Sequence, residues 1–129
     1  MRQTRWTNLP EAITVFEMSV THATPGRRQP MPVSFERREL DAVLNVYGFF
    51  VAAGEWKDYA IDALSDRAVF SIFRRTSEAP LYRVEKIPKL RNKQGMYQVV
   101  AMSGQVLKRG AELRQVLSVF DRQKLKLVT

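Results

Sequence analysis

The stretch "KDYAIDALSDRAVFSIFRR", residues 57–75, carries the strongest structural signal in this 129-residue chain. Apolar and polar residues alternate along its first half, as expected for a strand with one buried face. Ser65 and Asp66 interrupt the pattern as a tight turn, after which the alternation resumes. The stretch therefore predicts a β-hairpin with a single apolar face. That face comprises Tyr59, Ile61, Ala63, Ala68, Phe70 and Ile72.

Helical spacing precedes the hairpin. Ser34 is a suitable N-cap for a helix that runs to about Ala53, and Gly54 is a suitable stop. The expected buried stripe comprises Leu40, Val43, Leu44, Tyr47 and Val51, with Phe50 beside it, at intervals typical of a helix. Trp56 is expected to close the corner between helix and hairpin.

Further strands and a second helix are expected after the hairpin. "PLYRVEKI" (80–87) and "MYQVVAM" (96–102) fit strands, and "QVLK" (105–108) can pair with the latter. Residues 111–121 have helical spacing, and the tail "KLKLV" alternates like an edge strand. The predicted fold is α+β: a helix, a three- to four-stranded antiparallel meander, and a helix.

Residues 1–32 differ in composition from the rest. "THATPGRRQPMP" (21–32) contains three prolines and a glycine, which is typical of an extended linker. We expect residues 1–32 to form a flexible, loosely ordered arm and residues 33–129 to form one α+β domain.

Charge is unevenly distributed along the chain. The net charge is +8, of which residues 1–66 contribute −2 and residues 67–129 contribute +10. The chain has no cysteine, which excludes disulfides and thiolate chemistry, and no apolar run long enough to span a bilayer. These features favour a cytoplasmic protein and are compatible with a polyanion partner, although basic surfaces often serve only solubility.

The basic side chains of the second half are the candidate polyanion-binding residues. Those between residues 74 and 93 are expected to form a belt around one end of the sheet, and two more precede the second helix. Such groups would mostly contact phosphates. The set comprises Arg74, Arg75, Arg83, Lys86, Lys89, Arg91, Lys93, Lys108 and Arg109.

Catalytic constellations are sparse. The single histidine, His22, lies in the expected linker, and no glycine-rich phosphate loop or nucleophile elbow is present. Asp58 and Asp62 share a strand face, but Lys57 and Arg67 can serve as simple charge partners. We therefore expect no catalytic residues, no metal site, no cofactor and no enzyme.

A protein-interaction or regulatory module, such as a homodimer, is the alternative to a nucleic-acid-binding module. On the predicted register, Phe73 points away from the helix-covered face and lies beside Leu81 and Val69. These three would be the partner-binding residues if that face or an edge strand were an interface. An exposed apolar face around Phe73 would favour a protein partner, and a continuous basic belt would favour a polyanion.

Four quoted segments carry a family resemblance. "SFERRELDAVLNVYGFFVAAGEWKDYAID", "DRAVFSIFRR", "PLYRVEKIPKL" and "LKRG" together resemble domain of unknown function family 2794, small and mostly alphaproteobacterial proteins. The resemblance covers roughly residues 33–128. It implies a bacterial protein and supplies no activity, ligand or site residue. The expected function is therefore a non-enzymatic binding module, for RNA or a ribonucleoprotein first and for a protein second.

Overall fold

The computed structural model describes residues 31–75 and 79–128. Within them, helix α2 (Arg37–Ala52) precedes five strands, β1 (Asp58–Ala63), β2 (Ala68–Phe73), β3 (Tyr82–Lys86), β4 (Tyr97–Ala101) and β5 (Val106–Gly110). A short 3-10 helix, η1 (Pro88–Leu90), connects β3 to β4. The chain ends in α3 (Leu113–Leu117), the 3-10 turn η2 (Ser118–Phe120) and α4 (Asp121–Val128). The predicted α+β class is confirmed, with five strands in place of three to four.

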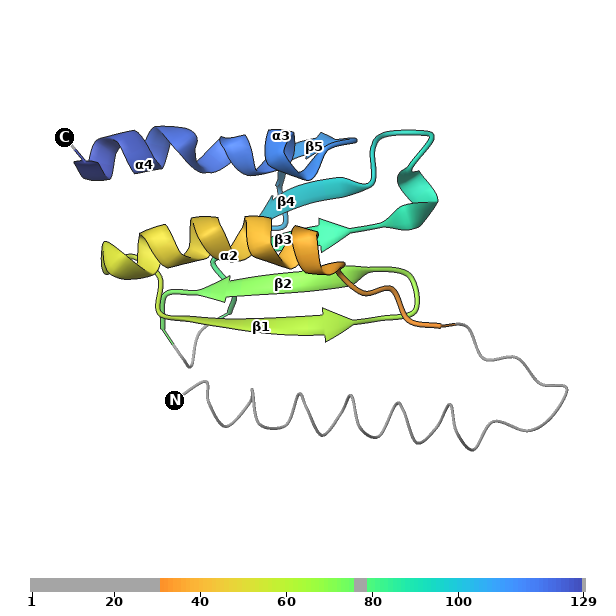
Figure 1. The fold of residues 1–129 in the computed structure, drawn as a ribbon, viewed down its shortest axis with the longest axis horizontal. Helices are drawn as coiled ribbons and strands as arrows, with labels where there is room; N and C mark the ends of the chain where they lie inside the picture. The colour runs from red at the N-terminus through yellow and green to blue at the C-terminus, as the bar shows by residue number, and fades with distance from the viewer. Residues whose placement is uncertain (1–30, 76–78, 129) are drawn as a thin grey trace, which may run out of the picture.

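The sheet is an antiparallel meander in which each strand pairs with the next, in the order β1-β2-β3-β4-β5. The predicted hairpin register is confirmed, since Ile61 lies opposite Phe70 and Leu64 closes the turn by donating its N–H to the Arg67 carbonyl. The three helices lie on one face of the sheet (Figure 1), which we call the inner face. The opposite face is the outer face.

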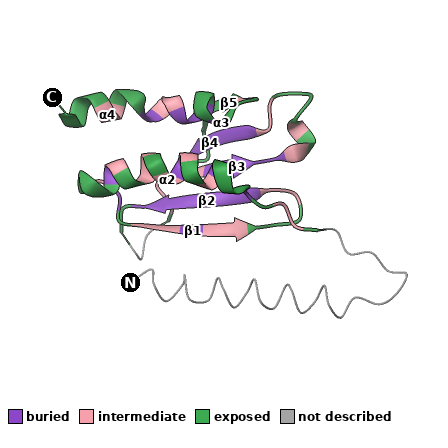
Figure 2. Cartoon of the chain, viewed as in Figure 1, coloured by how far each residue is buried: buried purple, intermediate pink, exposed green. Residues whose placement is uncertain are grey.

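The core lies between the inner face and the helices. Phe70, Val84 and Val99 of the three central strands are fully buried and belong to the same cluster as Val43 and Phe50 of α2. Figure 2 shows that burial is concentrated in the central strands, whereas α4 is largely exposed. At roughly 25 cal/mol per Å² of apolar surface removed from water, this cluster supplies the main driving force for folding.

The corner after α2 forms as expected. Gly54 has a φ of 78°, a left-handed conformation that favours glycine, and its N–H bonds to the carbonyl of Val51. Trp56 is 2% exposed and stacks on Phe50 with ring centroids 4.3 Å apart. The helix start differs from the prediction, because Glu36 and not Ser34 is the N-cap. Val51, predicted to be on the buried stripe, is exposed.

The tail differs more. Residues 121–128 form α4 and not an edge strand. The chain continues from α3 through η2 into α4 with no glycine or proline to turn it back toward the sheet. The edges of the sheet are β1 and β5, and β5 includes residues 106–108 of the predicted "QVLK" strand. The expected N-terminal arm lies outside the described residues apart from positions 31 and 32.

Candidate nucleic-acid interface

The sequence-predicted basic residues fall at two opposite ends of the sheet. Arg74 and Arg75 follow β2, whereas Lys89, Arg91 and Lys93 belong to the connection between β3 and β4. Because β3 runs the length of the sheet between these two positions, the groups cannot form one belt. The predicted belt around one sheet end is therefore wrong.

Lys86 is buried on the inner face and is bound to an acidic partner. Its Nζ donates to Glu39 Oε1 at 2.8 Å and to the Ser34 carbonyl at 3.0 Å. Tyr97 donates its hydroxyl to the other Glu39 oxygen. Glu39 also accepts the Glu36 backbone N–H at 2.6 Å, as part of a capping box that begins α2. The cluster joins α2 to β3 and β4, so Lys86 is a structural residue in this fold.

The electrostatics of this cluster favour an ionised carboxylate. Burial alone would raise the pKa of Glu39, but the hydrogen bonds from Lys86, Tyr97 and the Glu36 N–H outweigh it and hold the pKa below its ordinary 4.5. Burial, followed by the hydrogen bond to Glu39, raises the pKa of Tyr97 well above its ordinary 10.0. Glu39 therefore carries its charge, and Tyr97 its proton, across the neutral range.

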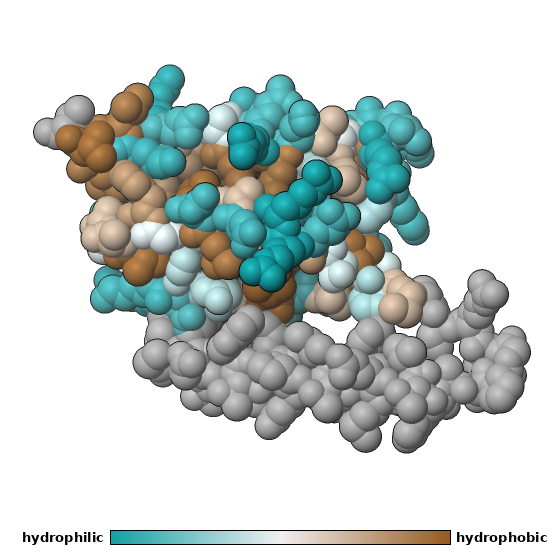
Figure 3. Space-filling view, in the orientation of Figure 1, coloured by the Kyte–Doolittle hydropathy of each residue, from teal (hydrophilic) through white to brown (hydrophobic). Residues whose placement is uncertain are grey.

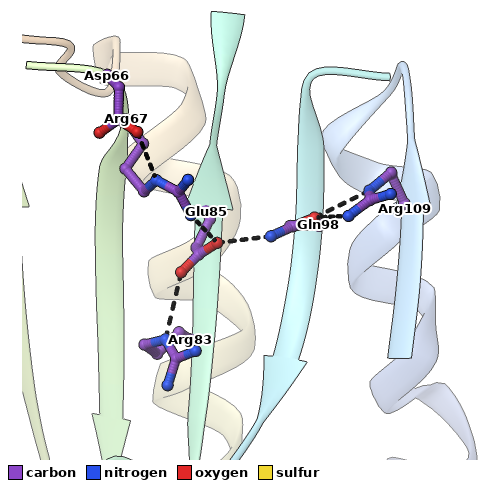
Figure 4. A network of polar contacts seen from close by, with 6 residues as sticks. All are labelled: Asp66, Arg67, Arg83, Glu85, Gln98 and Arg109. Atoms are coloured by element: carbon purple, nitrogen blue, oxygen red, sulfur yellow. Dashed lines mark hydrogen bonds and ion pairs between the residues drawn. The ribbon is translucent and has the colours of Figure 1, made fainter. Parts of the chain in front are cut away.

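A second polar network crosses the outer face (Figure 4) and begins at Glu85, which is 4% exposed. Glu85 accepts from Arg67 at 3.0 Å, from Gln98 at 2.6 Å and from Arg83 at 3.2 Å. The Gln98 carbonyl oxygen in turn accepts two bonds from Arg109, at 2.9 and 2.6 Å. Arg83 and Arg109 are thus held in place by side chains of the central strands.

The connection between β3 and β4, residues 88–95, is the basic loop. Its Lys89, Arg91 and Lys93 are exposed, and among the described residues none of them forms an ion pair with an acidic side chain. In Figure 3 hydrophilic side chains gather at the end of the molecule where this connection lies. The basic loop thus carries three exposed cations without a carboxylate partner among the described residues, whereas Arg67, Arg83 and Lys86 are each paired with a carboxylate.

The basic loop is held in a defined conformation beside β5. The Leu90 carbonyl accepts the N–H groups of Lys93, Gln94 and Gly95 at 3.0 to 3.1 Å, which closes the turn. The Gln94 side chain accepts a hydrogen bond from Arg109. Gly95 has a φ of 97°, and a Cβ placed there would lie 2.4 Å from the carbonyl carbon of Gly110. This close backbone contact fixes the loop next to Arg109.

The remaining predicted basic residues lie apart from the basic loop. Arg74 forms a loose, exposed pair with Glu55 at 3.8 Å, and together with Arg75 it lines a hollow of about 390 Å³ at the other sheet end. Lys108 is exposed on β5 and donates to the Ser118 hydroxyl at 3.2 Å. The arrangement brings Lys89, Arg91, Lys93 and Arg109 together and leaves Arg74, Arg75 and Lys108 outside the group.

The predicted partner-binding residues are not an exposed apolar face. Phe73 is fully buried, Val69 is 7% exposed, and Leu81 is half-buried. The register prediction for them is correct, since Val69 and Phe73 both belong to the outer face. The prediction that they are exposed for a partner is not met in this structure.

Sequence reasoning missed the two carboxylates that organise these networks. Glu39 lies 47 residues from Lys86, and Glu85 lies 13 residues from Gln98, so no local pattern links them. A usable signal existed for the first pair: alternation places Lys86 on the apolar side of β3, where a buried lysine needs a carboxylate.

In the parts of the chain that the structure describes, no cluster of three or more His, Cys, Asp or Glu side chains could hold a metal ion. None of the described helices is long and apolar enough to cross a membrane.

Comparison with known proteins gives the family. Residues 33–117 match the model of the family described as "Protein of unknown function (DUF2794)". The match spans well over half of the chain, so the chain belongs to that family, as the resemblance indicated. No curated protein and no solved structure matches it.

Proposed function

We propose that this chain is a non-enzymatic module that binds nucleic acid, RNA first, through the basic loop and Arg109. The observation that carries the proposal is the charge state of the basic loop: Lys89, Arg91 and Lys93 are exposed and have no acidic partner among the described residues. Lys and Arg groups of this kind bind phosphates and release counterions from nucleic acid.

The geometry of the loop supports a preformed site. A binding loop that is already held in one conformation loses little conformational entropy when it meets its ligand. Here the Gly95 contact with Gly110 and the Gln94 bond to Arg109 supply that order. The three side chains would contact successive phosphates, and Arg109 would extend the contact along β5. Such contacts position the strand without reading its bases, so affinity should be weak, sequence-tolerant and sensitive to salt.

Binding of a fluorescently labelled 20-nucleotide RNA, followed by anisotropy at low salt, tests the proposal. The variant Lys89→Glu/Arg91→Glu/Lys93→Glu should lose at least about tenfold in affinity, because three phosphate contacts become repulsions. A matched control, Arg37→Glu/Arg114→Glu/Arg122→Glu, makes the same change in net charge at exposed positions of the helices. Equal losses in the two variants, or no binding by the parent protein, would refute the proposal.

A second candidate function is a protein interaction through the edge strand β5. Among the described strands β5 has a neighbour on one side only, and its Val106 and Leu107 are 39% and 36% exposed. Exposed strand edges can pair with another chain. Lys108 and Arg109 on the same strand act against this, since lysines on edges commonly prevent such pairing. Sedimentation equilibrium distinguishes the two: a dimer that Val106→Lys dissociates would favour the second function.

A further inference from the structure

Three arginines form a row across the outer face, at the sheet end where the basic loop connects β3 to β4. The register aligns Glu85, Gln98 and Arg109 directly across β3, β4 and β5. Arg83 lies two residues before Glu85 on the same strand and therefore shares its face, and Arg67, just before β2, reaches Glu85 from the other side. We call Arg67, Arg83 and Arg109 the arginine row (Figure 4).

The guanidinium groups of the arginine row are held by their N–H edges. Arg67 Nη1 and Arg83 Nε donate to the two oxygens of Glu85, at 3.0 and 3.2 Å. Arg67 also donates from Nε to Asp66 at 3.3 Å. Arg109 donates from Nε, Nη1 and Nη2 to two glutamine side chains. These contacts fix the groups without covering them, since the side chains of Arg67 and Arg83 are 34% and 32% exposed and Arg109 is exposed.

An arginine held in this way is better suited to a nucleobase than to a phosphate. Phosphates are recognised by the N–H edge of a guanidinium, and in the arginine row part of that edge is already bound to the protein. The carboxylate of Glu85 also offsets the charge of Arg67 and Arg83. The planar face of a guanidinium, by contrast, stacks on unpaired bases, and a side chain that is already ordered loses little entropy when it does so.

The arginine row continues directly from the basic loop. Gln94 of the basic loop accepts a hydrogen bond from Arg109, the last member of the row. From β2 to β5 the row crosses three interstrand spacings, which is about 14 Å. Sheet faces of four strands receive two or three unpaired bases in other RNA-binding proteins. A strand whose phosphates lie on the basic loop would therefore bring its next nucleotides onto the arginine row.

We propose that the arginine row binds the unpaired bases of a single-stranded RNA by stacking. This inference rests on the proposed function and names its ligand class: the basic loop contacts the phosphates, and the arginine row contacts the bases. Glu85 is the positioning residue, because it holds Arg67 and Arg83 in place. Stacking tolerates any sequence, since every base has a π-face, but it requires a strand whose bases are not paired.

Replacing arginine by lysine in the row tests this proposal. Arg67→Lys/Arg83→Lys keeps the net charge and leaves an ammonium that can pair with Glu85, but it removes the planes on which bases stack. Anisotropy is measured with a single-stranded 20-nucleotide RNA and with an abasic strand of the same ribose-phosphate backbone. The parent protein should bind the RNA at least about tenfold more tightly than the abasic strand. The variant should lose about tenfold in affinity for the RNA and bind the abasic strand as the parent does.

The matched control is Arg114→Lys/Arg122→Lys, which makes the same chemical change at exposed positions of α3 and α4 and should alter neither affinity. Equal affinity of the parent protein for the two strands would refute base stacking, and this comparison does not depend on how a variant folds. A folded Arg67→Lys/Arg83→Lys that binds RNA as the parent does, or that loses equally on both strands, would refute it as well; tryptophan fluorescence in urea reports whether the variant is folded.

These failures are distinct from failure of the proposed function. If Lys89→Glu/Arg91→Glu/Lys93→Glu still loses affinity for both strands, the basic loop remains the phosphate site and only the arginine row is refuted. If the parent protein binds neither strand, both the proposed function and this inference are overturned.

Discussion

Replacing Lys86 by methionine should separate structural from binding lysines in this protein. Methionine keeps most of the apolar stem of lysine but removes its ammonium group. In the parent protein that ammonium donates to Glu39 Oε1 at 2.8 Å and to the Ser34 carbonyl at 3.0 Å. Glu39, 5% exposed, would then be a buried carboxylate supported only by Tyr97 and the Glu36 N–H. Removing one partner of a buried ion pair typically costs 3–5 kcal/mol, and the two surviving hydrogen bonds place the expected loss of unfolding free energy at about 3 kcal/mol.

The loss should depend on pH in a defined direction. The folded-state pKa of Glu39 lies below its unfolded value near 4.5, so its contribution to stability is complete above 4.5 and is lost as pH falls through the folded pKa. The difference between parent and Lys86→Met should therefore be largest at neutral pH and should shrink on acidification, because a protonated Glu39 no longer needs the ammonium.

Urea unfolding followed by tryptophan fluorescence measures both quantities, since Trp56 is buried in the core against Phe50. Lys89→Met is the matched control. Its lysine is exposed in the basic loop, so stability should change by less than about 0.5 kcal/mol while RNA affinity falls. A loss below about 1 kcal/mol for Lys86→Met at pH 7, or a loss that does not shrink in acid, would show that Lys86 and Glu39 do not form the buried pair described here.

Three further outcomes are expected. Glu85→Gln should lower the unfolding free energy by about 2 kcal/mol, because Arg67 and Arg83 lose a charged acceptor. The same variant should bind RNA more tightly in the anisotropy assay, because it removes a negative charge from the outer face. Gly95→Ala should lower the unfolding free energy measured in urea by at least about 2 kcal/mol, because the alanine Cβ would lie 2.4 Å from the Gly110 carbonyl carbon on a left-handed backbone. A loss of unfolding free energy below about 0.5 kcal/mol would contradict the loop geometry. Burial, followed by the charge of Asp58, raises the pKa of Tyr47 to about 12, and the pKa of Tyr97 is also raised. At pH 11, ultraviolet absorbance should therefore show that both hydroxyls are still protonated as long as the protein is folded. Ionisation of Tyr47 and Tyr97 at the ordinary tyrosine pKa of 10.0 would contradict this.

Sequence patterns predicted the parts of the fold that depend on neighbours in the chain. Alternation alone assigned Phe70 to the inner face and Phe73 to the outer face, because side-chain direction in a strand follows from position. The tail was mispredicted because Leu125 and Leu127, two positions apart, have the alternation of a strand. In the structure these residues belong to α4, whose Gln123 donates to the Tyr82 hydroxyl and whose Lys124 lies over the Phe49 ring.

The candidate site required three-dimensional information that local patterns do not contain. The predicted belt failed because successive turns of a meander lie at opposite ends of the sheet, a strand length of about 17 Å apart. This separates Arg74 from Lys89 although they are close in sequence. Which cations are neutralised was only partly visible, since the partner of Arg83 is two residues away on the same strand, whereas the partner of Lys86 lies 47 residues away. Charge counting therefore identified the right region and overestimated the number of residues free to bind a polyanion.

The salt dependence of RNA binding tests the role of the basic loop most directly. Each phosphate contact to a single strand contributes about −0.7 to the slope of log affinity against log salt concentration. If Lys89, Arg91 and Lys93 each contact a phosphate, replacing all three with glutamine should make that slope shallower by about 2. An unchanged slope, whatever the loss in affinity, would mean that these side chains do not contact the RNA and that the basic loop is not the binding site.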